Sequence, residues 1–167
     1  MFNWRNIPRM LELKALLLAA LEEHPELPTQ ERGNLLGECD LILSFLCYND
    51  ISAMSRLHRS ASAQMSRPAI SIRSSGGWTF GSPSVLMMFY RAPGELAGEL
   101  AEMAECMPHY YKITNGHGQG AETIMRAEAA FVQGRFTDAH IALESAYAQI
   151  EGNGQENMAL CCDFLAQ

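Results

Sequence analysis

The chain has 167 residues, 48% of them hydrophobic, which is enough for one domain with a sizeable core and argues against a wholly disordered protein. Its formal net charge is −7 and its 12 basic residues are scattered, so the concentrated positive charge typical of a nucleic-acid-binding protein is missing. The five cysteines form no C-x-x-C pair and lie in apolar helical patterns, as reduced cytoplasmic thiols do. The longest leucine-rich run, 16–21, is much shorter than a membrane span, so we expect a cytoplasmic protein without a membrane segment.

Two helices are predicted at the N-terminal end. The first, 7–21, has apolar residues on more than one face. We therefore expect it to pack on two sides, one of them covered by a preceding part of the protein. The second runs from about 30 to 48, with Thr29 as the expected N-cap, and its apolar pattern is typical of a buried helix.

A third helix is predicted over 51–65. Asp50 is placed to cap its N-terminus. The apolar side of this helix is weaker, and the opposite side carries Arg56, His58 and Arg59. We expect these three side chains on a solvated face.

Residues 66–83 interrupt the helical pattern with glycines and prolines around Trp78 and Phe80. A loop of this length inside a compact helical domain needs a physical reason. Either the two aromatic rings fill a gap between helix pairs, which their large area favours, or they line a functional groove. The loop separates the chain into two helical halves.

A short helix from 84 to 91 is predicted after the loop, with Ser82 as N-cap and Pro83 at the first helical position. A longer helix follows from about 95 to 113. Because Pro108 lies inside it, we expect this helix to be kinked or divided.

The best repeat signal is a helical hairpin over 121–150. Small and aromatic residues recur in it at separations of seven, two, three and seven: Ala127, Gly134, Phe136, Ala139 and Ala146. These separations resemble those of a tetratricopeptide helix pair, in which small residues let two helices approach closely. One hairpin cannot bury its own apolar face. We therefore predict a single all-α domain over 1–167, with antiparallel helix pairs stacked as a tetratricopeptide-like right-handed superhelix.

The final predicted helix, 156–166, is also apolar, which indicates a segment cut from a longer array.

The glycine-rich stretch 116–120 has two interpretations. It either ends one helix and begins the next, or its free amides and His117 hold an anion or a polar ligand. The sequence contains no phosphate-binding loop, no zinc-protease spacing and no G-x-S-x-G motif. We therefore expect no enzymatic activity, no metal and no cofactor in this chain.

Six segments together carry a family resemblance. They are 36–51, 54–55, 58–59, 78–84, 107–111 and 116–122. In combination they resemble the helical middle region of LuxR-type transcriptional regulators, and more narrowly that of the large ATP-dependent regulators similar to the maltose-regulon activator.

The resemblance implies a nucleotide-binding module before the helical region and a DNA-binding helix-turn-helix after it. Neither module is present in this chain, so ATP and DNA are assigned to no residue here. The resemblance implies a signal-receiving interaction domain excised from such a regulator, whose partners are the other modules, further copies of itself or a small-molecule inducer. The alternative is a small-molecule sensor with an aromatic groove, formed by Trp78, Phe80, Tyr110, Tyr111, His117 and Glu122.

Overall fold

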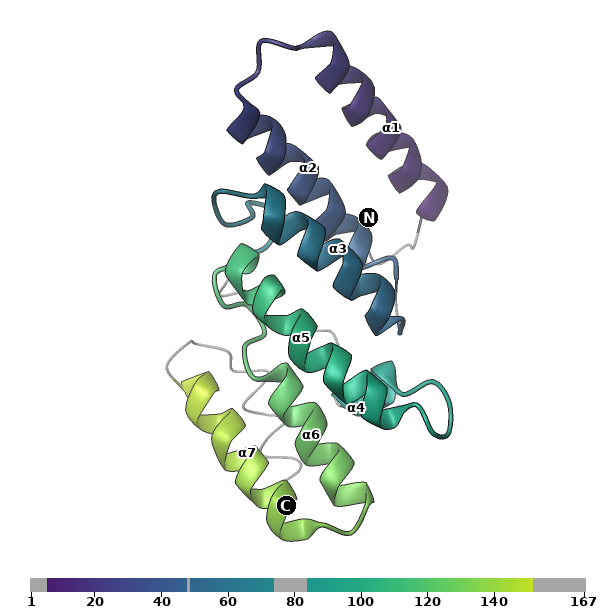
Figure 1. Ribbon diagram of the computed structural model, residues 1–167, viewed down its shortest axis with the longest axis vertical. Coiled ribbons are helices and arrows are strands. Elements are labelled where there is room, and N and C mark those ends of the chain that lie inside the picture. The colour runs from purple at the N-terminus through teal and green to yellow at the C-terminus, as the bar shows by residue number, and fades with distance from the viewer. Residues whose placement is uncertain (1–5, 48, 74–83, 152–167) are drawn as a thin grey trace.

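The computed structural model describes residues 6–47, 49–73 and 84–151, and these residues form seven α-helices and no strand. The helices are α1 (Ile7–Glu23), α2 (Thr29–Ser44), α3 (Ile51–Gln64), α4 (Val85–Phe89), α5 (Leu96–Thr114), α6 (Ala121–Val132) and α7 (Phe136–Glu151). They are stacked along the long axis of the molecule, from α1 at one end to α6 and α7 at the other (Figure 1). The all-α prediction is confirmed. Among these residues, no helix combines the length and the hydropathy that a membrane crossing requires.

The α2–α3 pair is antiparallel and tightly packed. Gly33, in the first half of α2, lies so close to the end of α3 that an added Cβ atom would come within 2.6 Å of the Gln64 carbonyl oxygen. Further along α2, Asp40 accepts a hydrogen bond from Ser60 Oγ at 2.6 Å. As predicted, the Asp50 side chain caps α3, accepting the backbone N–H of Ala53 at 2.9 Å.

The neighbouring helices α3 and α5 run in the same direction (Figure 1). Arg59 in the middle of α3 forms ion pairs with Glu102 and Glu105 in the middle of α5, at 2.7 and 2.9 Å. Beyond the end of α3, the backbone N–H of Ala69 donates to the carbonyl of Ile113 near the end of α5. The segment that connects the end of α3 to the start of α5 therefore runs back along the length of the helices. As a result, the helix directions do not alternate here as they would in a row of antiparallel pairs.

The α6–α7 pair is antiparallel again. Gly120, just before α6, approaches Ile150 at the end of α7, and the turn between the two helices contains Gly134 with φ +75°. Three alanines of the predicted hairpin are buried: Ala127, Ala139 and Ala146. Phe136 is 63% exposed and packs edge-on against Phe131, with the ring centroids 5.5 Å apart.

The two halves of the chain share one plan. In Figure 1, α1, α2 and α3 run in alternating directions, and α5, α6 and α7 repeat the same sequence of directions. The α3–α5 contact joins these two three-helix units, and we call it the junction.

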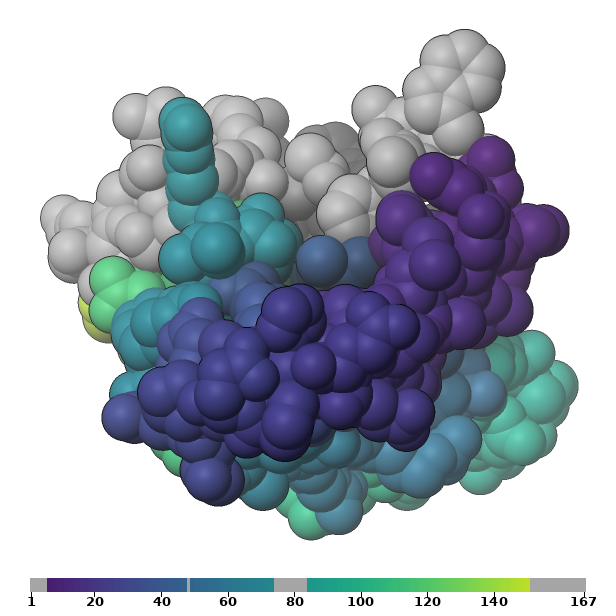
Figure 2. Space-filling model, turned by 90° about the horizontal axis from the view of Figure 1, so that it is seen from above, coloured from purple at the N-terminus to yellow at the C-terminus, as the bar shows by residue number. Residues whose placement is uncertain are grey.

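Helix α1 is the least covered of the long helices. Leu21 is its one buried residue, and Ile7, Leu11 and Leu18 on one stripe are 44%, 53% and 41% exposed. Figure 2 looks down on this end and shows the purple side chains of α1 as a ridge beside those of α2. Among the described residues α1 contacts only α2 closely, so the expectation that a preceding part of the protein covers its second side stays a prediction.

Two further predictions on the second half need correction. Ser84 caps α4, accepting the N–H of Met87 at 3.0 Å, so this helix does not begin with Ser82 as its N-cap. Pro108 does not divide α5, which runs without interruption from Leu96 to Thr114, so of the two predicted effects only a kink stays a prediction. The predicted start of α2 is also off by one position, since Pro28 is the N-cap and Thr29 the first helical residue. The predicted helix 156–166 lies outside the described residues.

Candidate functional site

Four of the residues predicted to line an aromatic groove meet at the turn between α5 and α6. The hydroxyl of Tyr110 lies 2.7 Å from Nδ1 of His117. The hydroxyl of Tyr111 donates to the carboxylate of Glu122 and accepts the backbone N–H of Gly120 at 3.1 Å. Trp78 and Phe80, the other two predicted groove residues, lie outside the described residues.

This polar cluster is largely closed to solvent. Tyr110 is 1% exposed and His117 is also buried. Burial raises the pKa of Tyr110, and burial together with the neighbouring Glu122 carboxylate raises the pKa of Tyr111. Both phenols are therefore neutral hydrogen-bonding groups at ordinary pH. Their hydrogen bonds hold the turn in place.

The backbone of the turn explains its glycines. Helix α5 is capped at its C-terminus by Asn115, whose φ is +54°, and the N–H of the following Gly116 donates to the Tyr111 carbonyl at 2.9 Å. Gly120 has φ +101° and lies against Ile150 of α7. A side chain at this position would be strained by the backbone and crowded by α7. The glycine pattern therefore joins two helices and lets α7 pack closely.

His58 is a residue whose environment the sequence interpretation missed. It is 1% exposed, in contrast to the solvated position predicted for it. Its Nε2 atom lies 2.9 Å from Ser44 Oγ, its Nδ1 atom lies 3.1 Å from Cys106 Sγ, and its ring lies 4.9 Å from that of Tyr110. Burial lowers the pKa of His58 to about 4, so the imidazole is neutral in the junction. Arg56 is exposed as expected, and Arg59 is half-buried in its ion pairs.

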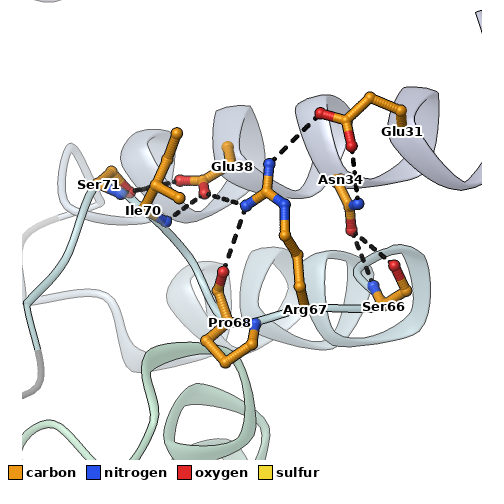
Figure 3. A network of polar contacts seen from close by, with 8 residues as sticks. All are labelled: Glu31, Asn34, Glu38, Ser66, Arg67, Pro68, Ile70 and Ser71. Carbon is orange, nitrogen blue, oxygen red and sulfur yellow. Dashed lines mark hydrogen bonds and ion pairs between the residues drawn. The ribbon is translucent and has the colours of Figure 1, made fainter.

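A buried carboxylate anchors the chain where it leaves α3. Glu38 of α2 accepts the backbone N–H of Ile70 at 2.5 Å and the hydroxyl of Ser71 at 2.6 Å (Figure 3). Arg67 approaches the same carboxylate at 3.3 Å, and Asn34, one turn earlier on α2, accepts the N–H of Ser66 at 2.9 Å. These contacts attach residues 66–71 to α2.

Two more buried carboxylates hold the chain where it approaches α5. Glu128 of α6 accepts the backbone N–H of Leu86 at 2.7 Å, at the beginning of α4. Burial raises the pKa of Glu128, while this hydrogen bond partly opposes the shift. Glu99 of α5 accepts the backbone N–H of Arg91 at 3.2 Å and also its guanidinium. The described parts of the connection between the two units are therefore attached to α2, α6 and α5.

An open groove lies on α5, α6 and α7, with a volume of about 400 Å³. Its lining includes Leu100, Arg126, Ala130, Ile141, Ala142 and Ser145. Arg135 and Asp138 at its edge form an ion pair of 2.6 Å. Arg126 is exposed and has no ion pair or hydrogen bond within the described residues. The groove therefore combines apolar side chains with a guanidinium that has no partner among the described residues, although the chain as a whole is acidic.

The described residues contain no group of three or more histidine, cysteine or acidic side chains placed to hold a metal ion. No protein-family model, curated protein or solved structure matches the chain. The functional argument therefore depends on the geometry of the chain itself.

Proposed function

We propose that this chain is the signal-receiving, protein-interaction domain of a LuxR-type regulator. In this proposal it is a tetratricopeptide-like helical array that relays the binding of an inducer or partner to an ATP-binding module and a DNA-binding module elsewhere in the same protein. Support comes from the stacked helices, the buried alanines of the α6–α7 pair and the six segments that resemble this family.

The observation that carries the relay proposal is the junction. His58 connects Ser44 of α2 to Cys106 of α5 through buried contacts, and Arg59 pairs with two glutamates of α5. Lys112 of α5 also donates to the Ser62 carbonyl of α3 at 2.9 Å. Because packed interfaces of this kind resist continuous deformation, a displacement of one unit is transmitted to the other.

The arrangement we propose differs from an uninterrupted row of helix pairs. The parallel contact between α3 and α5 makes the array a stack of two three-helix units. The connection between the units is held by buried carboxylates, which favours one relative orientation of the two halves.

Exposed apolar surface supports a role in protein interaction. About half of the surface of each of four apolar residues is exposed at the two ends of the stack: Ile7, Leu11 and Leu18 on α1, and Ile141 on α7. Exposed apolar surface of this kind marks sites where other proteins dock. The alternative role as a small-molecule sensor remains a prediction, since Trp78 and Phe80 lie outside the described residues.

Two experiments test the proposal. Reading the coding sequence on both sides of this segment should show an ATPase module before it and a helix-turn-helix after it, and a free-standing reading frame would contradict the regulatory role. In the intact protein, Arg59→Glu should reduce the response of a reporter gene to the inducing signal without lowering the amount of protein. Arg56→Glu changes the same charge on the exposed side of α3 and should leave the response unchanged. Equal responses of the two variants would contradict the relay.

A further inference from the structure

Two features of the molecule have complementary chemistry and no partner within the described residues. One is the groove on α5, α6 and α7, with its apolar side chains and the guanidinium of Arg126, for which the described residues supply no partner. The other is the exposed stripe of α1, where Ile7, Leu11 and Leu18 are followed by the exposed carboxylate of Glu22. These four residues are separated by four, seven and four positions, so they lie along one side of the helix.

We propose that the α5–α7 groove binds the α1 helix of a second copy of this chain. The apolar stripe of α1 lies in the groove of its neighbour, and Glu22 pairs there with Arg126. This is the way in which amphipathic helices generally bind apolar grooves, with anchors spaced by one or two helical turns. The proposal deepens the interaction role proposed above, and it depends on that role.

The occupant comes from another molecule because of the geometry of the stack. Helix α1 and the groove lie at opposite ends of the molecule (Figure 1), so the α1 helix of a chain cannot reach the groove of the same chain. The sparse packing of α1 against the rest of the described chain is consistent with its binding to a second molecule. Leu21 is its one buried side chain, so α2 leaves the stripe available to a second surface.

Charge supports the same occupant. The chain carries 19 acidic and 12 basic residues, and Arg126, which has no partner in the described part of the chain, presents a positive charge beside an apolar surface. The stripe of α1 offers apolar side chains and a carboxylate in that order. Opposite charges across an interface set the register and suppress incorrect partners. One helix in one groove is a small interface, so we expect association that depends on protein concentration.

When α1 of each copy binds the α5–α7 groove of the other, the helix–groove contact forms twice in one symmetric dimer. Sedimentation equilibrium of the purified chain over a wide range of concentration should therefore show a monomer–dimer equilibrium. Arg126→Glu and Glu22→Arg, made singly, should each weaken the dimer by at least about tenfold, because each places like charges in contact. The double variant should regain the dimer.

A mixture of the two single variants provides a sharper readout. Both contacts are attractive when an Arg126→Glu chain meets a Glu22→Arg chain, so the mixture should dimerise although neither variant does so alone. Arg56→Glu and Glu23→Arg are matched controls, since they make the same charge changes at exposed positions outside the two surfaces. The controls should dimerise as the unaltered chain does, and circular dichroism should show equal helix content throughout.

Three results would overturn the proposal. They are a chain that stays monomeric at every concentration, a dimer that neither single variant weakens, and a mixture that fails to associate. None of these would affect the relay role, which the flanking coding sequence and the Arg59→Glu reporter experiment test separately.

Discussion

His58 Nδ1 lies 3.1 Å from Cys106 Sγ, at the centre of the contact between the two three-helix units. The roles of donor and acceptor follow from the neighbours. Ser44 Oγ donates to the Leu41 carbonyl at 2.6 Å, so it accepts from His58 Nε2. Nδ1 therefore accepts from the thiol of Cys106, whose pKa burial raises to about 12. The neutral imidazole makes one hydrogen bond to each side.

This arrangement predicts an acid-sensitive junction. The pKa of His58 falls from 6.5 to about 4 on folding, so the unfolded chain binds its proton first as the pH decreases. The stability that depends on neutral His58 is complete above pH 6.5 and is lost as the pH falls towards 4, by about 3 kcal/mol. Urea unfolding across this range should show the loss for the unaltered protein, and His58→Asn should remove it.

The raised pKa of Glu128 acts in the opposite direction, because protonation of that carboxyl favours the folded state. Glu128 contributes equally to the pH dependence of the unaltered protein and of the His58→Asn variant. Its contribution therefore cancels when the two are compared. Equal dependence on pH for the two proteins would show that His58 is not buried as a neutral group.

Glu38 should contribute more to stability than its exposed neighbour on α2. Glu38→Ala leaves the N–H of Ile70 and the hydroxyl of Ser71 without their acceptor, and we expect a loss of about 2 kcal/mol of unfolding free energy. Glu31→Ala removes a half-exposed partner of Arg67 and the acceptor of the Asn34 side-chain amide, and it should cost less than about 1 kcal/mol. Hydrogen exchange of the Ile70 amide should become faster only in the first variant. Equal effects would mean that Glu38 does not anchor the segment.

Two helical glycines should respond to alanine in opposite ways. An added Cβ at Gly33 would come within 2.6 Å of the Gln64 carbonyl oxygen, so Gly33→Ala forces α2 and α3 apart and should destabilise the protein by about 1–3 kcal/mol. An added Cβ at Gly98 of α5 has no atom within 4 Å, so Gly98→Ala should stabilise it by about 0.5–1 kcal/mol. Chemical denaturation should be used to measure the unfolding free energy of both variants. If Gly33→Ala proved neutral or stabilising, the close packing of α2 against α3 would be contradicted.

The hydroxyl of Tyr111 should be required for the α5–α6 turn. Tyr111→Phe removes the acceptor of the Gly120 N–H and the donor to Glu122, and we expect a loss of about 1–2 kcal/mol and faster hydrogen exchange at Gly120. Tyr147→Phe makes the same change at a tyrosine that is 43% exposed and should be neutral. An unchanged exchange rate at Gly120 would argue against this role.

Local signals in the sequence were sufficient for much of the fold. Asp50 caps α3 because a short acidic side chain before a helical pattern meets free backbone amides wherever the helix lies. The small residues Ala127, Ala139 and Ala146 are buried in the helix pair that their spacing predicted. Tyr110, Tyr111, His117 and Glu122 also meet at one turn, because they flank it closely in sequence.

The contacts between distant segments were not predictable in this way. The sequence around Glu38 and His58 does not indicate whether these polar side chains are buried or exposed. Their partners, Ile70 and Cys106, lie 32 and 48 positions away. Asn34 and Glu38 are polar residues one turn apart on one face of α2, and this spacing was the available hint of a buried polar network. The parallel direction of α3 and α5 depends on the path of the connection between them, which no periodicity reports.

The claim on which the account depends is that the junction makes the two helical units one cooperative body. Native-state hydrogen exchange with increasing denaturant measures this directly at Leu41 of α2 and Met125 of α6, which are both buried. We predict that their opening free energies converge on one global value before the protein unfolds. Two separate values, one for each unit, would contradict the relay.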